Sequence, residues 1–189
     1  MHVGRSDADP TLRKALAIGA DKALRIDTDA TDGFVVANQI ANFVKENPYD
    51  LIIAGRESID YNGAMVPGLI SGFLNINFVT NCTKLEFDKG KVVLEREIDG
   101  GKEILESELP LIIGGQKGLV EESDLRIPNM RGIMMARQKP LDVNKPQNIN
   151  SRAVDNKFFK PEEKGEVKLV KSDELDKLID LLENEAKVI

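Results

Sequence analysis

The sequence has few of the residues from which metal centres and catalytic sites are usually built. It contains one cysteine, Cys82, one histidine, His2, and no tryptophan. A single cysteine excludes an internal disulfide and a multi-cysteine metal site, and a single histidine removes histidine clusters and histidine-based general bases from the main candidates. Cys82 lies in a stretch of alternating apolar and polar residues, which favours a small core residue over a nucleophile.

Other signals are absent as well. No apolar stretch approaches the length of a membrane-spanning helix, and the first ten residues, MHVGRSDADP, lack the regions of a signal peptide. Acidic residues outnumber basic ones by 32 to 26, without a long basic run, which argues against a nucleic-acid surface. We therefore expect a soluble cytoplasmic protein that inserts into no membrane and binds no nucleic acid.

Familiar catalytic motifs are missing too. The sequence has no Gly-x-Ser-x-Gly, Walker or His-Glu-x-x-His pattern, so no motif supports a hydrolase, phosphoryl-transfer or metalloenzyme function. Glu95, Glu97 and Asp99 share one face of a predicted strand whose other face carries Leu94 and Ile98, which is typical of a sheet solvated on one side. These carboxylates are therefore interpreted as surface residues.

The 189 residues suffice for one domain with a sizeable core and an appendage. Residues 1–4 are too few to predict a strand. Asp9 as N-cap, Pro10 and the stop at Gly19 predict a first helix. Strands and helices then alternate, as in right-handed βαβ units with a parallel sheet, at about residues 23–26, 33–47, 51–54 and 64–73.

After Phe73 the apolar period changes to two. Three strands, with turns at Lys89-Gly90 and Asp99-Gly100-Gly101, predict an antiparallel meander at residues 78–87, 92–98 and 104–108. Residues 111–113 predict a buried strand that returns to the main sheet, and residues 130–137 predict a short helix.

The composition shifts beyond Pro140. Residues 145–165 predict an extended arm, and Ser172 is the expected cap of a last amphipathic helix that carries Leu175, Leu178, Ile179 and Leu182. We thus predict an α/β domain over residues 1–140 and an arm with a helix over residues 141–189. The arm could dock on a partner chain or pack back on its own domain, and the pattern leaves both open.

The stretch from Leu51 to Phe73 is the main candidate for a binding site. Leu51–Ala54 predicts a strand buried on both faces, a polar loop runs from Gly55 to Gly63, and the next helix has Pro67 in its first turn. A strand, a loop and a helix N-terminus in this order suit an anion. From the pattern alone, an ordinary strand–helix connection is the favoured interpretation.

Several segments together resemble a known family. They are ALAIGAD at residues 15–21, GRESID at residues 55–60, REIDGG at residues 96–101 and MRGIM at residues 130–134. In this order they resemble the beta subunit of electron transfer flavoprotein. The resemblance covers essentially the whole chain, and it implies a Rossmann-like α/β fold of the adenine nucleotide alpha hydrolase-like type.

The resemblance also implies a function. In the family the beta subunit pairs with an alpha subunit, shares an FAD with it and holds an AMP, and has no catalytic residues of its own. Electrons pass from acyl-CoA or other dehydrogenases of fatty acid oxidation to a quinone-linked acceptor. The AMP residues correspond here to Val3, Gly4, Gly55, Arg56, Glu57, Ser58, Ile59, Asp60, Tyr61, Asn62, Gly63, Ala64, Met65 and Val66.

A partner-recognition loop of the family corresponds to residues 125–132. By resemblance, Met130 is the apolar anchor for a pocket on the dehydrogenase, and its neighbours in the contact are Arg126, Ile127, Pro128, Asn129 and Arg131. The alternative is that Met130, Ile133 and Met134 form only the buried face of a short helix. We expect Met130 to be the anchor and Ile133 to be a core residue.

Two departures limit these expectations. The family's beta chain begins with a further strand, helix and strand before the position of Met1, so we expect an incomplete nucleotide site and an exposed sheet edge. Residues 63–66 also resemble electron-bifurcating members, which hold a second FAD in place of AMP, and the choice between AMP and FAD stays open. The rival hypothesis is a non-redox adenine-nucleotide-binding regulatory protein of the same fold.

Overall fold

The computed structural model describes residues 1–189 except residues 31, 60, 89, 164 and 166. Asp60 of the predicted nucleotide loop and Lys89 of the predicted turn thus lie outside the described residues. The chain forms two compact units, residues 1–154 and residues 155–189. The predicted division at residue 140 stays a prediction, although residues 141–144 form a strand of the first unit.

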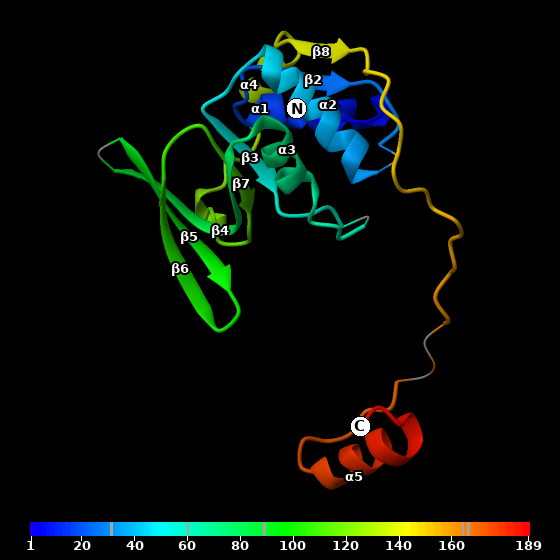
Figure 1. The fold of residues 1–189 in the computed structure, drawn as a ribbon. Helices are drawn as coiled ribbons and strands as arrows, with labels where there is room; N and C mark the ends of the chain where they lie inside the picture. Colours follow the sequence, from blue (N-terminus) through cyan, green and yellow to red (C-terminus); the bar gives the residue numbers. More distant parts are fainter. Residues whose placement is uncertain (31, 60, 89, 164, 166) are drawn as a thin grey trace. The chain divides into compact units, whose positions relative to one another are not determined.

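The described strands of the first unit form two sheets (Figure 1). The smaller sheet is parallel and contains, in spatial order, β1 (His2–Val3), β2 (Ala23–Ile26) and β8 (Leu141–Asn144). The larger sheet contains, in spatial order, β3 (Leu51–Gly55), β7 (Leu111–Gly115), β4 (Asn77–Asp88), β5 (Lys91–Ile98) and β6 (Gly101–Ser107). Its strands β3, β7 and β4 are parallel, and β4, β5 and β6 form an antiparallel meander.

The α/β class with parallel strands and a meander is therefore as the sequence predicted, and β7 joins β3 as expected. The prediction of a single main sheet was wrong, because the described strands form two separate sheets. The interpretation of residues 1–4 as too short for a strand was also wrong. His2 and Val3 pair with Arg25 and Ile26, so the neighbouring strand, and not the length of the segment, determines this pairing.

Four helices of the first unit have clear sequence signals. They are α1 (Asp9–Ile18), α2 (Gly33–Glu46), α3 (Val66–Leu74) and α4 (Met130–Ala136). The Asp32 carboxylate caps α2 by accepting from the Val35 N–H at 2.7 Å, and Gly19 ends α1 with a φ of 136°. Asp9 is not the N-cap of α1 but its first residue, because a short 3-10 turn (Ser6–Ala8) precedes it and Ala8 takes the cap position.

Among the described residues, three apolar clusters form the core. The helices α2 and α3 cover one face of β3 and β7 around Ala37, Ile70 and Ile112, and side chains of β4, β5 and β7 form a second cluster around Cys82 and Leu111. The third cluster joins α1, β2, α4 and β8. Cys82 is fully buried, as predicted.

The prediction that β3 is buried on both faces was wrong, because Leu51, Ile52 and Ala54 are only half-buried and Ile53 is exposed. The Ile53 side chain is 60% exposed, although Ile113, its partner in register on β7, is fully buried. The two residues lie on the same face of the sheet, so the apolar side chains that cover this face over β7 do not extend over Ile53 in β3.

The second unit contains α5 (Leu175–Asp180), which continues as a π-helical segment (Leu181–Ala186). The predicted cap Ser172 was wrong, because the N-cap residue is Glu174 and it makes no side-chain capping bond. Lys168 and Glu185 form an ion pair within this unit. Whether the helix docks on a partner stays a prediction.

Candidate site at the ends of the parallel strands

The predicted nucleotide residues lie at the carboxyl ends of parallel strands. Val3 and Gly4 are buried where β1 ends, and the Gly4 N–H donates to the Ile26 carbonyl at 3.1 Å. Gly55 ends β3, and the Arg56 N–H donates to the Gly115 carbonyl of β7 at 3.2 Å. This edge is where open α/β sheets bind ligands, since loops and helix N-termini meet there.

The end of the predicted loop packs against the start of α2. A Cβ atom at Gly33 would lie 2.8 Å from Cγ and Sδ of Met65 and 3.4 Å from a methyl group of Val66. The helix α2 in turn contacts β1. The first turn of α2 thus lies next to both Met65 and Val66, and its helix also touches the strand that carries Val3.

The N-termini of α2 and α3 differ in whether a side chain accepts hydrogen bonds from their first N–H groups. At α2 the Asp32 carboxylate accepts from the N–H groups of Val35, Ala153 and Arg152 and from the Ser151 hydroxyl. Partial burial raises the pKa of Asp32, but these hydrogen bonds outweigh it and lower the pKa to about 2. The N-terminus of α2 therefore already holds an anion, its own aspartate.

The helix α3 begins differently. Its N-cap residue is Met65, which makes no side-chain capping bond, and Pro67 stands in the first turn. The first N–H groups of a helix have no intrahelical acceptor, so those of Val66 and Gly68 suit an anion. Of these two helix ends, α3 is the one whose chemistry fits a phosphate group.

The loop between β3 and α3 is mostly exposed. Asn62 and Ala64 both have a φ of 48°, in the left-handed region that alanine rarely adopts. The Asn62 N–H donates to the Ser58 carbonyl at 2.8 Å, and this bond closes a turn inside the loop. Ile59 is 90% exposed. The other exposed members are Ser58, Tyr61, Asn62, Gly63, Ala64 and Met65, while Arg56, Glu57 and Val66 are half-buried.

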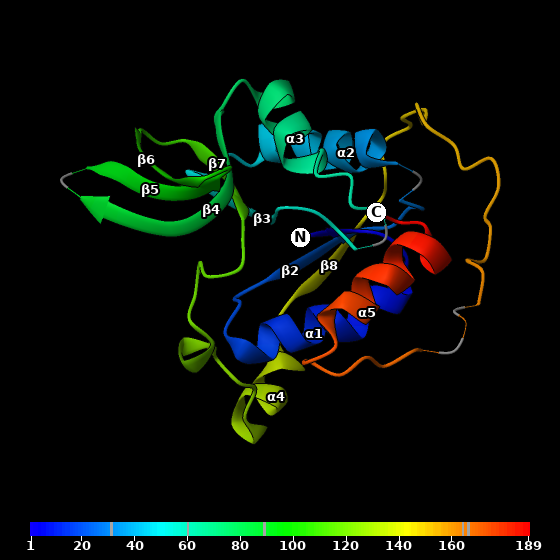
Figure 2. The same ribbon diagram turned by 90° about the horizontal axis from the view of Figure 1, so that it is seen from below.

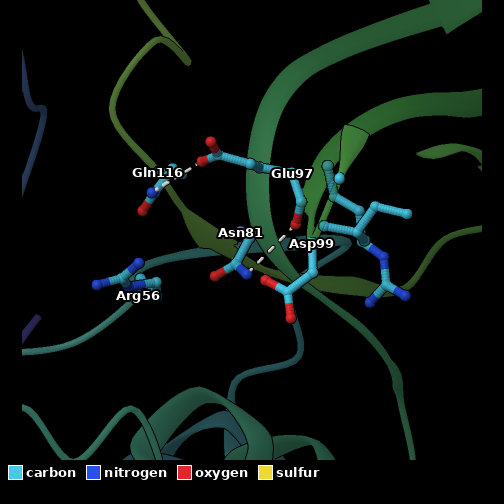
Figure 3. A pocket seen from close by; sticks show the side chains of 8 residues that line it. Arg56, Asn81, Glu97, Asp99 and Gln116 are labelled. Atoms are coloured by element: carbon cyan, nitrogen blue, oxygen red, sulfur yellow. Dashed lines mark hydrogen bonds between the residues drawn. The ribbon is translucent and has the colours of Figure 1, made fainter. Parts of the chain in front are cut away.

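Arg56, at the start of this loop, lines a polar cavity of about 560 Å³ (Figure 3). Its guanidinium pairs with Glu57. Within the cavity wall, the Gln116 amide donates to the Glu97 carboxylate at 3.1 Å, and the Asn81 amide donates to the Glu97 backbone carbonyl at 3.4 Å (Figure 3). The other lining residues are Arg96, Ile98 and Gly100.

Sequence reasoning did not find this cavity. Glu97 and Asp99 are exposed, as predicted for a solvated face, but that face curves around a hollow. The curvature follows an irregularity in β4, where Asn81 has a φ of 53° and the register with β7 shifts between Val79 and Cys82. Asparagine within an alternating strand was the one available signal, since it tolerates the left-handed region.

The predicted partner segment is exposed except at Gly132, which is half-buried. Asn129 caps α4 by accepting from the Gly132 N–H at 2.7 Å, and Met130 is the first residue of the helix. Met130 is 75% exposed and Met134 is 65% exposed, so the alternative that they form a buried face is wrong. The expected core role of Ile133 is also wrong, because it is 42% exposed and the helix buries Ala136 instead. The remaining exposed residues are Arg126, Ile127, Pro128 and Arg131.

Two features are absent from the described residues. Among them, no group of three or more histidine, cysteine, aspartate and glutamate side chains could hold a metal ion. Outside the five omitted positions, no helix has both the length and the hydropathy that crossing a membrane requires.

Known proteins resemble this chain over most of its length. The model of the electron transfer flavoprotein domain matches residues 1–147. Electron transfer flavoprotein subunit beta of Bacillus subtilis is 32% identical over an alignment that covers 99% of this chain and 77% of the relative. The subunit beta of Syntrophomonas wolfei is 36% identical over 73% of this chain, and that of Homo sapiens is 29% identical over 77% of it.

The alignments cover different shares of these relatives. The matched part is 54% of the Syntrophomonas protein and 58% of the human protein, so the chain spans little more than half the length of several relatives. The family model nevertheless matches more than three quarters of the chain, and the Bacillus relative aligns with nearly all of it. The chain therefore belongs to the electron transfer flavoprotein beta-subunit family.

Proposed function

We propose that the chain acts as the beta subunit of a heterodimeric electron transfer flavoprotein. In this role it relays electrons from acyl-CoA or other dehydrogenases to a quinone-linked acceptor and has no catalytic residues of its own. The observation that carries the proposal is the alignment of 99% of the chain with a beta subunit. The partner is an alpha subunit, with which the chain shares an FAD. That FAD, when bound, supplies the redox chemistry.

The nucleotide held by the chain itself is an AMP or, in its place, a second FAD. The uncapped N-terminus of α3 supports this assignment, because its first N–H groups suit a phosphate. The polar loop from Arg56 to Met65 forms one wall, and the buried Val3 and Gly4 belong to another. Asp32 keeps a phosphate away from α2, since its carboxylate already occupies that helix end.

Partner recognition is assigned to the segment around Met130. Apolar side chains that stand this far out of a short helix have no role in the core, and methionine adapts to irregular pockets. Met130 is the proposed anchor, and Ile127, which is 84% exposed, extends the apolar surface next to it. The arm and the second unit are proposed to dock on the alpha subunit.

Co-expression with the alpha subunit of the same organism tests the proposal. The expected result is a yellow heterodimer on size-exclusion chromatography, with a flavin absorption spectrum that follows the protein peak. A chain that stays separate from alpha, or a heterodimer without flavin, would contradict it. The rival function, a non-redox nucleotide sensor, predicts a colourless protein that needs no alpha subunit.

A further inference from the structure

The helices α1 and α4 bind each other's C-terminal ends. The Arg13 guanidinium of α1 donates through Nη1 to the carbonyls of Ala136 and Lys139, both at 2.8 Å. The Lys139 ammonium, just beyond α4, donates to the carbonyls of Leu16 at 3.1 Å and Ala20 at 2.7 Å. The last carbonyls of a helix have no intrahelical donor and favour a positive charge. Each helix end is thus capped by a cation from the other segment.

The two helices also approach closely at one glycine. A Cβ atom at Gly132 would lie 2.4 Å from the backbone carbonyl oxygen of Ala17, which cannot rotate away. Ala136 and Leu16 are nearly fully buried in the same contact, together with Ala23 of β2. The contact therefore requires glycine at position 132 and fixes the distance between α1 and α4 (Figure 2).

An isolated helix of this length would not be stable in water. The helix α4 has seven residues, whereas helices shorter than about 12 residues are marginal without tertiary contacts. Its outward residues Met130 and Met134 are mostly exposed and contribute little to its order. The helix is therefore held by α1, through Gly132 and the two cationic caps.

We infer that Arg13, Gly132 and Lys139 are positioning residues for partner recognition: they hold α4 on α1 so that Met130 is presented in a fixed orientation to an apolar pocket of a partner protein. The inference rests on the proposed function, which assigns partner binding to Met130. A segment that is ordered before binding loses less conformational entropy when the complex forms. Loosening it weakens binding without changing the contact residue itself.

Two substitutions remove the cationic caps and keep most of the side-chain volume, Arg13→Met and Lys139→Met. Lys14→Met is the matched control, because Lys14 is an exposed cation on the same helix. In the heterodimer, the assay follows flavin reduction by a reduced acyl-CoA dehydrogenase. Each cap variant should raise KM for the dehydrogenase about tenfold and leave kcat and the flavin spectrum unchanged, since hydrogen bonds to charged groups are lost. Arg13→Lys should restore part of the affinity.

Hydrogen exchange in the same heterodimer reports the positioning directly. The amides of residues 130–137 should exchange about tenfold faster in each cap variant than in the Lys14→Met control. If Arg13→Met does not fold, Gly132→Ala provides the same test by forcing the two helices apart.

The outcomes separate this inference from the proposed function. If Met130→Asp raises KM strongly but the cap variants leave KM and exchange unchanged, the positioning role is overturned and the proposed function stands. If Met130→Asp itself leaves KM unchanged, partner binding is not at Met130, so the assignment of Met130 and the positioning role are both overturned while the beta-subunit role stands. Faster exchange together with a raised KM in the cap variants supports the inference.

Discussion

Asp32→Asn should destabilise the first unit in a pH-dependent way. The Asp32 carboxylate caps α2 and also accepts from the backbone N–H groups of Arg152 at 2.6 Å and Ala153 at 2.8 Å. Asparagine still caps a helix well through its side-chain oxygen, but it is neutral and cannot serve all of these donors. The substitution therefore isolates the contacts that tie residues 151–153 to α2.

The magnitude follows from the lowered pKa. Hydrogen bonds lower the pKa of Asp32 from 3.8 to about 2 despite partial burial. One pKa unit corresponds to about 1.4 kcal/mol, so the ionised carboxylate contributes at most about 2.4 kcal/mol, and about 1 to 2 kcal/mol after solvent screening. Because the folded-state pKa is depressed, this stability is complete above about pH 5 and falls as the pH drops through 3.8 toward 2.

Urea unfolding of the natural chain and the variant at pH 7 and pH 3 checks this. The difference in the free energy of unfolding should be about 1 to 2 kcal/mol at pH 7 and roughly half of that at pH 3. Asp29→Asn is the control, because Asp29 forms an exposed ion pair with Arg5 and its loss should change little. An Asp32→Asn difference that is absent at pH 7, or equally large at both pH values, would refute the reasoning.

Three further predictions concern the core and the backbone. Ile113→Ala should cost about 3 kcal/mol in urea unfolding, because the side chain is fully buried, while Ile53→Ala at the exposed partner position should cost under about 1 kcal/mol; equal losses would contradict the packing described. Burial raises the pKa of the Cys82 thiol, so a maleimide should label the native chain slowly and the urea-unfolded chain quickly, and rapid native labelling would oppose this. Gly72→Ala should stabilise the fold by up to about 1 kcal/mol, because the new methyl group in α3 meets open space. Gly19→Ala should destabilise the fold by about as much, because Gly19 has a φ of 136°. Shifts of the same sign in the thermal unfolding temperature of the two variants would contradict the local geometry.

Local chemistry made much of the fold predictable. The alternation of strands and helices predicted α2 from about residue 33, and Gly19 predicted the end of α1, because a helix stop depends on only a few neighbouring residues. The meander followed from the change to a period of two. The order of strand, polar loop and helix at the end of β3 suggested a candidate anion site, but the pattern alone favoured an ordinary connection, and only the family resemblance gave the site a nucleotide.

Contacts between distant residues were not predictable. The pairing of β1 and of β8 with β2 depends on which strand lies alongside, and this information is not contained in either segment. Arg13 and Ala136 are 123 residues apart, so no local pattern predicts that one caps the other. The exposure of Ile53 and Ile133 likewise depends on whether another element covers that face, and apolar residues in a short segment cannot show it.

In the proposed role the chain serves an electron carrier and does not sense a nucleotide on its own. The most direct test is to purify the chain together with its co-expressed alpha subunit, release the bound small molecules by heat and determine their masses. The expected masses are those of FAD together with AMP, or of FAD alone in larger amount if a second flavin takes the AMP position. Release of ATP without any flavin would contradict this role.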